Sequence, residues 1–468
     1  MKQLLTITTD LLIIYSCIML SFFFLGEQNY LTHFEENLNA FYVISPMVGI
    51  LYLIFMYAFG LYSSFRRSWG DVIYTVFLIS VSLTISIMAS CFFIRNGAFA
   101  FPRSVIFLSS LFYFIFLTCW RLIIWKLERK KHGIKKVIAI GPDAVNLAEI
   151  IKNKHKDIYT VTTTCSETDP RLESLIQKCQ QIFLTAGIED SNREKIFYLA
   201  SNYGKSVCFV PEYRDVSIMS ASLQKTDDIP TFHIEKMGLT LEERFVKRMI
   251  DLLLGGIGFI IALPVGLITA FFIKLDGGPV FYTQERLTRN GKVFKVFKFR
   301  SMVPNAEKLS GPVQASDNDP RITKVGKIMR ATRLDELPQI LNILVGDMSI
   351  VGPRPERPFF CEQFEKEVPQ YRGRHKVKAG LTGLAQVEGK YNTSFDDKLR
   401  YDLLYISRYS LLNDLLIILQ TVKILFLKES TEGMQNSISI PQNTPTTAKP
   451  IQERMETNRK PIEITNIG

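Results

Sequence analysis

Four long apolar stretches at the start of the chain constrain its fold more than any other feature. They lie near residues 4–25, 41–62, 73–94 and 104–125. Each is long enough to cross a bilayer as a helix, which takes about 20 residues. The first stretch lacks a small-residue cleavage site after a short apolar core, so we interpret it as a retained helix rather than a signal peptide. The sequence therefore predicts a four-helix transmembrane bundle within residues 1–127.

The charges between these stretches predict the orientation of the bundle. Lys2 precedes the first stretch, whereas the loop at 26–40 contains three Glu and no Lys or Arg. The arginine pair at 66–67 follows the second stretch and a strongly basic run at 126–136 follows the fourth, while the loop between the third and fourth is ambiguous. Because positive residues concentrate in cytoplasmic loops, both ends of the bundle are expected in the cytosol. Asp10, inside the first stretch, is expected to face a partner or the bundle interior.

The composition agrees with a membrane protein that meets anionic partners. The chain is 47% hydrophobic and carries a net charge of +11. A basic balance suits anionic lipid or phosphate ligands as well as nucleic acid, but no nucleic-acid motif is present. The seven Cys form no C-x-x-C pair and the five His have no metal-ligand spacing. The cysteines are therefore expected to be reduced thiols. Because no nucleic-acid motif is present, nucleic acid is not expected as a partner.

Residues 128–238 have the pattern of a small soluble α/β domain. A buried strand is expected at 137–141, a helix at 144–151, and further strands at 182–184 and 207–210. Dinucleotide binding requires G-x-G-x-x-G after the first strand, and here only the first glycine, Gly141, is present. We expect a regulatory or dimerising role for this domain rather than NAD binding.

A fifth apolar run, at residues 249–273, has basic residues on both sides. By length it suits an ordinary crossing, but the positive-inside rule places both of its ends in the cytosol. Pro264 lies in the middle of the run, where a proline removes a backbone hydrogen bond and kinks a helix. The favoured prediction is a re-entrant helix that bends at Pro264, with a straight crossing as the alternative. Asp251 is expected to pair with Lys247 one turn earlier.

The stretch with the clearest chemistry contains two adjacent carboxylates, Asp335 and Glu336, just before Pro338. Proline suits a first helical turn, because its missing N–H needs no partner there. Neighbouring residues on a helix diverge by roughly 100°, so the two carboxylates are expected to address different partners. One can then bind a metal while the other attacks a substrate. The alternative is an ordinary helix start, where acidic residues offset the positive end of the helix dipole.

The residues that follow favour the catalytic interpretation. Gly346 is expected to end the helix after about two turns. The sequence Gly352-Pro-Arg-Pro355 predicts a stiff loop that presents Arg354. A guanidinium is well shaped for bidentate phosphate binding. Carboxylates that can hold a divalent metal, together with a presented arginine, indicate phosphoryl chemistry.

Five motifs follow one another in the second half of the chain. They are Lys298-Phe-Arg300-Ser-Met302, Leu334-Asp-Glu-Leu-Pro-Gln339, Gly346-Asp-Met-Ser349, Gly352-Pro-Arg-Pro355 and Gly380-Leu-Thr-Gly-Leu-Ala-Gln-Val387. In this order they resemble the bacterial sugar transferases, the polyprenyl-phosphate hexose-1-phosphate transferases that start capsule, exopolysaccharide and O-antigen repeat units. The resemblance covers roughly residues 240–430, and the preceding chain resembles the long form of that family.

The resemblance implies a mixed membrane protein with a four-helix transmembrane bundle, a Rossmann-like α/β domain and a monotopic α/β catalytic domain. The catalytic domain is expected at 239–429 with the re-entrant helix at 249–273, and a disordered tail at 430–468. By its composition, the polar stretch that begins at Val303-Pro304 and extends to Asp319 is expected to be mobile. The expected location is the bacterial inner (cytoplasmic) membrane, multi-pass, with the catalytic domain facing the cytosol.

The resemblance also implies roles for individual residues. Asp335 is expected to attack the β-phosphate of a UDP-sugar and form an aspartyl phosphosugar, Glu336 to hold Mg²⁺, and Arg354 to steady phosphate. The hexose-1-phosphate then passes to undecaprenyl phosphate and UMP is released. Substrate contacts are expected from Lys298, Arg300, Arg330, Arg333 and Gln339, and the re-entrant helix is marked by Arg248, Asp251 and Pro264.

Two other functions stay open on the sequence. A non-catalytic membrane scaffold or chain-length regulator would need the four crossings but not the carboxylate pair. A glycosyltransferase that releases UDP would use the same donor. The expected partners are a UDP-sugar, undecaprenyl phosphate and the lipid bilayer, with a homodimer as an open question.

Overall fold

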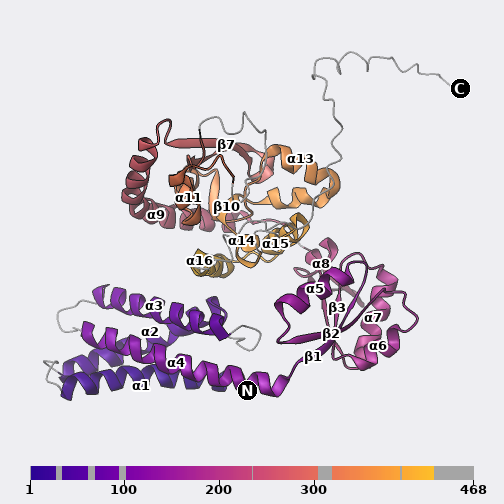
Figure 1. Ribbon diagram of the computed structural model, residues 1–468, viewed down its shortest axis with the longest axis horizontal. Coiled ribbons are helices and arrows are strands. Elements are labelled where there is room, and N and C mark those ends of the chain that lie inside the picture. The colour runs from indigo at the N-terminus through magenta and orange to yellow at the C-terminus, as the bar shows by residue number, and fades with distance from the viewer. Residues whose placement is uncertain are drawn as a thin grey trace, which may run out of the picture.

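The computed structural model describes residues 2–27, 34–61, 69–93, 102–234, 236–303, 319–389 and 393–425. Within these residues the chain forms a helical bundle, a parallel-sheet unit and a C-terminal α/β unit (Figure 1). The predicted tail at 430–468 lies outside the described residues, as does most of the predicted polar loop.

The N-terminal bundle consists of four helices long and apolar enough to cross a membrane. In the bundle α1 and α3 both pack against α4, and α2 packs against α3. Asp10 forms a buried ion pair with Arg121, and the hydroxyl of Tyr52 donates to Asp10 at 2.7 Å. The expected partner of Asp10 is therefore present in the bundle interior. The helices are α1 (Lys2–Glu27), α2 (Phe34–Ala58), α3 (Trp69–Phe93) and α4 (Arg103–His132).

The middle unit is a four-stranded parallel sheet in the order β2-β1-β3-β4, which agrees with the predicted α/β domain. Gly141, after the first strand, has a φ of +123°, and a Cβ there would lie 2.2 Å from the hydroxyl oxygen of Thr185. This glycine is therefore required by a close contact within the domain. The elements are β1 (Lys135–Ile140), α5 (Ala144–Lys154), β2 (Tyr159–Cys165), α6 (Leu172–Lys178), β3 (Gln181–Leu184), α7 (Asp190–Asn202), β4 (Ser206–Phe209) and α8 (Tyr213–Ile218).

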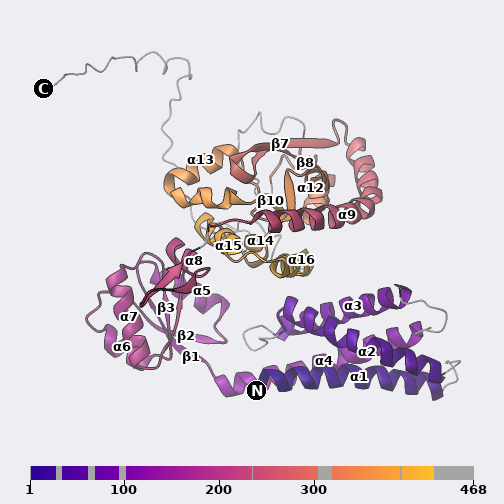
Figure 2. The ribbon, with the colours of Figure 1, turned by 180° about the vertical axis from the view of Figure 1, so that it is seen from behind.

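A hairpin of β5 (Ser222–Thr226) and β6 (Ile229–His233) leads from this unit to α9 (Leu241–Leu275). Thr240 and Glu243 form a reciprocal capping box that starts α9. A straight helix of 35 residues would be about 50 Å long. Instead α9 changes direction, with one arm along the C-terminal unit and the other turned up its side (Figures 1 and 2).

Both arms of α9 pack against the same C-terminal unit. Gly255, in the first arm, lies against Ile343 and Leu344. Ile273, in the second arm, shares a buried cluster with Phe299. Pro264 lies between these contacts, and the missing hydrogen bond at a proline is the usual cause of a sharp bend.

The first arm of α9 is fixed by polar contacts that correct one local prediction. Lys247 pairs with Asp414, not with Asp251, and its ammonium also donates to Tyr405 at 3.2 Å. Asp251 instead accepts hydrogen bonds from the Ser349 hydroxyl at 3.0 Å and the Ile350 N–H at 2.9 Å. Both side chains are buried, and an unpaired buried charge is costly. Each side chain therefore pairs with the group that packs against it in the fold rather than with its neighbour on the helix.

The C-terminal unit is built from two small β pairs and short helices. The antiparallel pair is β7 (Phe281–Leu287) and β8 (Val293–Phe299), and the connection between them contains Asn290 at a φ of +60°. The parallel pair is β9 (Met348–Val351) and β10 (Ala379–Thr382). The helices are α11 (Lys324–Ala331), α12 (Gln339–Val345), α13 (Pro358–Glu367), α14 (Leu384–Glu388), α15 (Phe395–Ser407) and α16 (Leu411–Leu425), with 3₁₀ turns at Arg289–Gly291, Leu334–Glu336 and Pro369–Lys376.

The last helix, α16, connects the C-terminal unit to the bundle. Ile417 on one face is buried in the C-terminal unit. Near the end of the helix, the Lys423 ammonium donates to the Thr75 hydroxyl at 3.2 Å. The backbone carbonyl of Lys423 accepts from the Tyr74 hydroxyl at 2.9 Å. The structure therefore shows α16 as a helix that packs against both units.

Candidate active site

The carboxylate pair lies in a 3₁₀ turn, Leu334–Glu336, directly before α12. Pro338 is the residue that precedes the first helical residue of α12, and Gly346 ends the helix at a φ of +101°. Both agree with the predicted short helix. Arg333, the residue before the turn, has a left-handed φ of +56°, which is uncommon for a residue with a side chain. The pair is thus presented by a constrained turn rather than by a regular helix.

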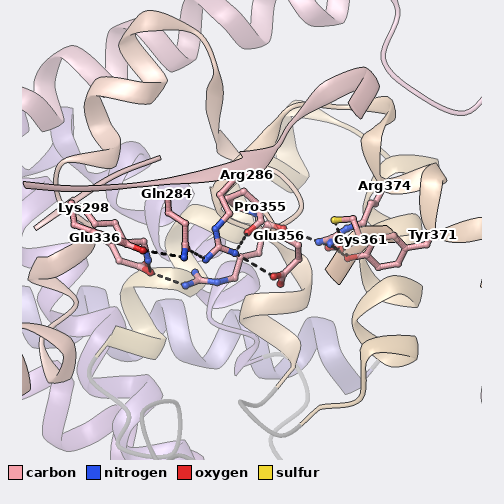
Figure 3. Close-up of polar contacts among 12 residues, drawn as sticks. Gln284, Arg286, Lys298, Glu336, Pro355, Glu356, Cys361, Tyr371 and Arg374 are labelled. Carbon is pink, nitrogen blue, oxygen red and sulfur yellow. Dashed lines mark hydrogen bonds and ion pairs between the residues drawn. The ribbon is translucent and has the colours of Figure 1, made fainter. Parts of the chain in front are cut away.

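Two cations from distant parts of the sequence meet at Glu336. The Lys298 ammonium donates to its Oε1 at 2.9 Å, and the Arg354 guanidinium donates to the same oxygen at 2.7 Å. Lys298 comes from β8 and Arg354 from the loop after β9, and Figure 3 shows Lys298 and Glu336 at one end of a chain of polar contacts. Three of the predicted site residues therefore come together.

The electrostatics of the two carboxylates differ. Burial alone raises the pKa of Glu336, but the charges and hydrogen bonds of Arg354 and Lys298 outweigh it and lower the pKa below its ordinary value. Burial raises the pKa of Asp335, and the repulsion from Glu336 adds to this, while Lys298, Arg330 and Arg354 oppose it. Glu336 therefore stays ionised. Asp335 has lost part of its hydration, so fewer water molecules must be displaced before one of its oxygens can react.

The loop that carries Arg354 is held by two glycine-containing segments in close contact. Gly352 follows β9 and its N–H donates to the Thr382 carbonyl, while the Gly380 N–H donates to the Pro353 carbonyl at 2.9 Å. A Cβ on Gly380 would lie 2.1 Å from the Gly352 nitrogen, and one on Gly383 would lie 2.2 Å from the Gly352 oxygen. The two glycine motifs of the sequence are thus required by one close backbone approach.

Further polar residues, not singled out in the sequence, fix the same loop. Arg374 donates to the Arg354 carbonyl at 2.8 Å and forms a buried ion pair with Asp402. Arg286 donates to the Pro355 carbonyl at 3.1 Å and pairs with Glu356 at 3.4 Å (Figure 3). Arg374 lies in a strongly basic stretch of the sequence, residues 371–378, but sequence spacing gives no sign that its partner is Asp402.

Asn342 on α12 is another residue that the sequence did not single out. It is fully buried, its side-chain N–H₂ donates to the Lys295 carbonyl at 2.8 Å, and its side-chain oxygen accepts from the Phe297 N–H at 2.9 Å. The amide therefore pairs with the free edge of β8 as a neighbouring strand would. This contact sets the position of Lys298 relative to the helix that follows the carboxylate pair.

Several predicted site residues lie elsewhere. Arg300 is buried, and its guanidinium contacts the carbonyls of Ile273 and Gly277 at the end of α9. Arg248 donates to the Ile343 and Leu344 carbonyls at 2.6 and 2.7 Å and so caps the C-terminus of α12.

The structure places these two arginines in structural contacts, away from Glu336. Asp251 ties α9 to β9, as described above. Arg330 lies close enough to Asp335 to influence its pKa, and Gln339 is buried at the first position of α12. The roles of Arg330, Arg333 and Gln339 toward a substrate stay predictions.

The carboxylate pair suits Mg²⁺ only together with substrate oxygens. Among the described residues no group of three or more His, Cys, Asp or Glu forms a metal site. Mg²⁺ is commonly bound through one or two carboxylates with substrate phosphates and water as the other ligands. The donor set of Asp335 and Glu336 fits that chemistry and does not fit a site made by the protein alone.

Comparisons with known proteins agree with the geometry. The family described as "Bacterial sugar transferase" matches residues 242–428. The chain is 40% identical over 220 residues to the UDP-N-acetylgalactosamine-undecaprenyl-phosphate N-acetylgalactosaminephosphotransferase of Aeromonas hydrophila, covering 42% of this chain and 52% of that protein. It is 33% identical over 247 residues to the undecaprenyl-phosphate galactose phosphotransferase of Salmonella typhimurium, covering 49% and 51%.

The match therefore spans about half the length of these relatives. A longer match is to the UDP-glucose:undecaprenyl-phosphate glucose-1-phosphate transferase of Escherichia coli. The two chains are 32% identical over 319 residues, which is 63% of this chain and 68% of that protein. The matched family segment contains the carboxylate pair, Lys298 and Arg354. The chain belongs to the bacterial sugar transferase family.

Proposed function

We propose that the protein transfers hexose-1-phosphate from a UDP-sugar to undecaprenyl phosphate, or a related polyprenyl phosphate, and releases UMP. The observation that carries the proposal is the convergence of Lys298 and Arg354 on Glu336, beside the partly desolvated Asp335. The named relatives act on UDP-sugars and undecaprenyl phosphate. The transfer would be the first membrane step of exopolysaccharide, capsule or O-antigen synthesis.

In the proposed reaction Asp335 is the nucleophile. One of its oxygens attacks the β-phosphorus of the UDP-sugar, the bond from that phosphorus to the bridging oxygen breaks, and UMP leaves with that oxygen. An oxygen of the lipid phosphate then attacks the same phosphorus and breaks its bond to Asp335. The carboxylate is regenerated and the product is a lipid diphosphate sugar. Two displacements replace one difficult step, which is the gain of covalent catalysis.

The cations around the pair would stabilise charge on the transferred phosphoryl group. Phosphoryl transfer depends mainly on positioning and on fixed opposite charges. Arg354 and Lys298 are oriented by Glu336 before substrate arrives, so little reorganisation is needed. Glu336, with substrate oxygens, would hold Mg²⁺, which neutralises charge on a diphosphate when bound. Arg330 and Arg333 flank the pair and are proposed as further diphosphate ligands.

A re-entrant α9 would place this site at the cytosolic membrane surface, where a water-soluble donor meets a lipid acceptor. The helix is apolar with large exposed side chains, for example Ile260 at 72% exposure and Leu267 at 64%. Such side chains suit a lipid environment better than water. Its two arms pack on one α/β unit, whereas a straight crossing would carry its second half away from that unit. We therefore propose that both ends of α9 face the cytosol of a bacterial inner membrane.

The test is a nucleotide-release assay with protein purified in detergent or nanodiscs. The protein is incubated with undecaprenyl phosphate, Mg²⁺ and each member of a panel of UDP-hexoses, which includes N-acetylated ones. Release of UMP and a lipid diphosphate sugar is expected with at least one donor, whereas UDP as the product would identify a glycosyltransferase instead. No turnover with any donor would favour a scaffold and refute the proposal.

The nucleophile assignment has its own variant. Asp335→Asn is expected to lower turnover by at least 1,000-fold, because an amide is a poor nucleophile, and to abolish a covalent adduct with donor labelled in the sugar. Asp276→Asn, at the exposed end of α9, makes the same chemical change away from the site and should retain activity. Wild-type turnover by Asp335→Asn would remove that residue from the mechanism.

A further inference from the structure

The short helix α8 of the middle α/β unit packs against the C-terminal unit, close to the candidate active site. In both views α8 lies beside α15 (Figures 1 and 2). Val216 on α8 is fully buried, and it shares one cluster with residues of α13, of α15 and of the 3₁₀ turn between them. Those residues are Cys361, Tyr371, Leu399 and Leu403. A residue of one unit is therefore part of the core of the other.

Polar contacts at both ends of α8 fix the same packing. The Tyr213 hydroxyl, at the start of α8, donates to the Asp396 carboxylate on α15 at 3.0 Å. After the other end of α8, the Met219 carbonyl accepts from the Arg408 guanidinium at 3.3 Å. A hydrogen bond at each end and a buried side chain between them hold this helix in one orientation on α15.

The helix is also bound to the carboxyl edge of the parallel sheet. The Glu212 side chain, directly before α8, accepts from the N–H of Gly187 at 3.1 Å, in the loop after β3. Asp215 on α8 forms an ion pair of 2.7 Å with Arg193 on α7, and both side chains are largely buried. The position of α8 is therefore set by the α/β unit, and α8 presents that position to the C-terminal unit.

A short path leads from the shared cluster to the loop that carries Arg354. The Arg374 guanidinium lies over the ring of Tyr371, with 4.9 Å between its central carbon and the ring centroid (Figure 3). Arg374 donates to the Arg354 carbonyl at 2.8 Å and pairs with Asp402 on α15. Tyr371, Arg374 and Asp402 are each at most 6% exposed. Because buried groups are close-packed, a shift of α8 is transmitted to them.

We propose that α8 positions Arg354 for phosphate binding, with Val216 and Tyr213 as positioning residues. Both residues act through the buried groups around Arg374 and not by contact with the substrate. This gives the α/β unit a part in the reaction that requires no ligand of its own. The inference rests on the proposed function, because the position of Arg354 matters to the rate only if a diphosphate is its ligand.

The first test shortens the buried side chain of α8. Val216→Ala leaves a cavity in the shared cluster, into which the Tyr371 ring can relax. A displacement of about 1 Å can cost about 100-fold in rate, so kcat/KM for the UDP-sugar in UMP release is expected to fall about 5-fold or more. Val137→Ala is the matched control. It makes the same change at a fully buried position in β1 of the same unit, and it should keep kcat/KM within about 2-fold of wild type.

The second test removes a single hydroxyl. Tyr213→Phe keeps the ring and deletes the hydrogen bond to Asp396, so a smaller fall in kcat/KM is expected, about 3-fold. Tyr203→Phe is its control, because the Tyr203 hydroxyl donates to Glu173 at 2.5 Å within the α/β unit. That variant should retain the kcat/KM of wild type.

The third test asks whether Val216 acts through Arg354. Arg354→Lys keeps the charge but loses the planar fork of the guanidinium, so the position of the loop matters less. The Kd of the UDP-sugar is measured for wild type, Val216→Ala, Arg354→Lys and the double variant, each with Asp335→Asn to prevent turnover. Val216→Ala is expected to weaken binding about 5-fold beside Arg354, and less than about 2-fold beside the lysine.

The same loss in both backgrounds would show that Val216 does not act through Arg354 and would overturn the inference. Equal impairment of Val137→Ala and Val216→Ala, or wild-type kcat/KM in both α8 variants, would also overturn it. In each of these cases wild type still releases UMP, and the proposed function stands. A wild type that releases no UMP would refute the proposed function and this inference with it.

Discussion

The Arg374 guanidinium lies 2.8 Å from the carboxylate of Asp402, and both side chains are almost fully buried. The same guanidinium donates to the backbone carbonyl of Arg354. A buried ion pair thus fixes the backbone of the residue that contacts Glu336. The pair lies outside the carboxylate turn, yet the position of a phosphate-binding arginine depends on it.

Replacing one member of this pair is expected to be more damaging than replacing both. Arg374→Met leaves the Asp402 charge buried without a partner, which should lower the free energy of unfolding by roughly 3–5 kcal/mol. The double variant Arg374→Met with Asp402→Leu should recover a large part of that loss. Denaturant unfolding in detergent measures both. Equal losses in the single and double variants would show that the pair is not what stabilises the loop.

Lys298→Gln is expected to shift the acid limb of activity to higher pH. Asp335 must be ionised to attack, burial raises its pKa, and the Lys298 charge opposes that rise. Without the ammonium the pKa of Asp335 increases, so more of the enzyme is protonated at a given acidic pH. The pH dependence of kcat/KM for UMP release shows the shift.

Lys292→Gln, an exposed lysine near the start of β8, provides the control and should leave the profile in place. An unchanged acid limb in Lys298→Gln would mean that Asp335 does not titrate in that limb.

Asn342→Leu is expected to loosen the contact between α12 and β8. The substitution leaves the half-buried Lys295 carbonyl and Phe297 N–H without their partner, at up to about 1–3 kcal/mol for each group that water cannot reach. Unfolding free energy should fall accordingly, and the KM for the UDP-sugar should rise because Lys298 is no longer held in position. Leu341→Ala, on the more exposed face of the same helix, should cost less. A stable variant with wild-type KM would contradict this role.

The variant Asp276→Cys places a thiol at the end of α9, and a reagent on the cytosolic side is expected to react with it. A membrane-impermeant maleimide should label Asp276→Cys in inside-out vesicles and not in intact spheroplasts. Ser166→Cys, in the α/β domain, is the matched control and should label with the same sidedness. Labelling of the two cysteines from opposite sides would show a straight crossing and would place the carboxylate pair on the side of the membrane away from the cytosol.

Much of the architecture is determined by local sequence pattern. Runs of about 20 apolar residues predict membrane helices because helix length and bilayer thickness match. The short helix after the carboxylate pair follows from Pro338 and Gly346, whose backbone preferences act within a few residues. The single glycine of the first turn, Gly141, likewise predicted no dinucleotide loop, and the structure gives that glycine a close contact within the domain.

Only the tertiary structure decided which charged side chains meet. Lys247 could reach Asp251 one turn away, yet it pairs with Asp414, 167 positions later in the chain. Lys298 and Arg300 are two residues apart, but one contacts Glu336 and the other the end of α9. Such choices depend on which groups are buried together when distant segments pack, and sequence spacing carries no information on that burial.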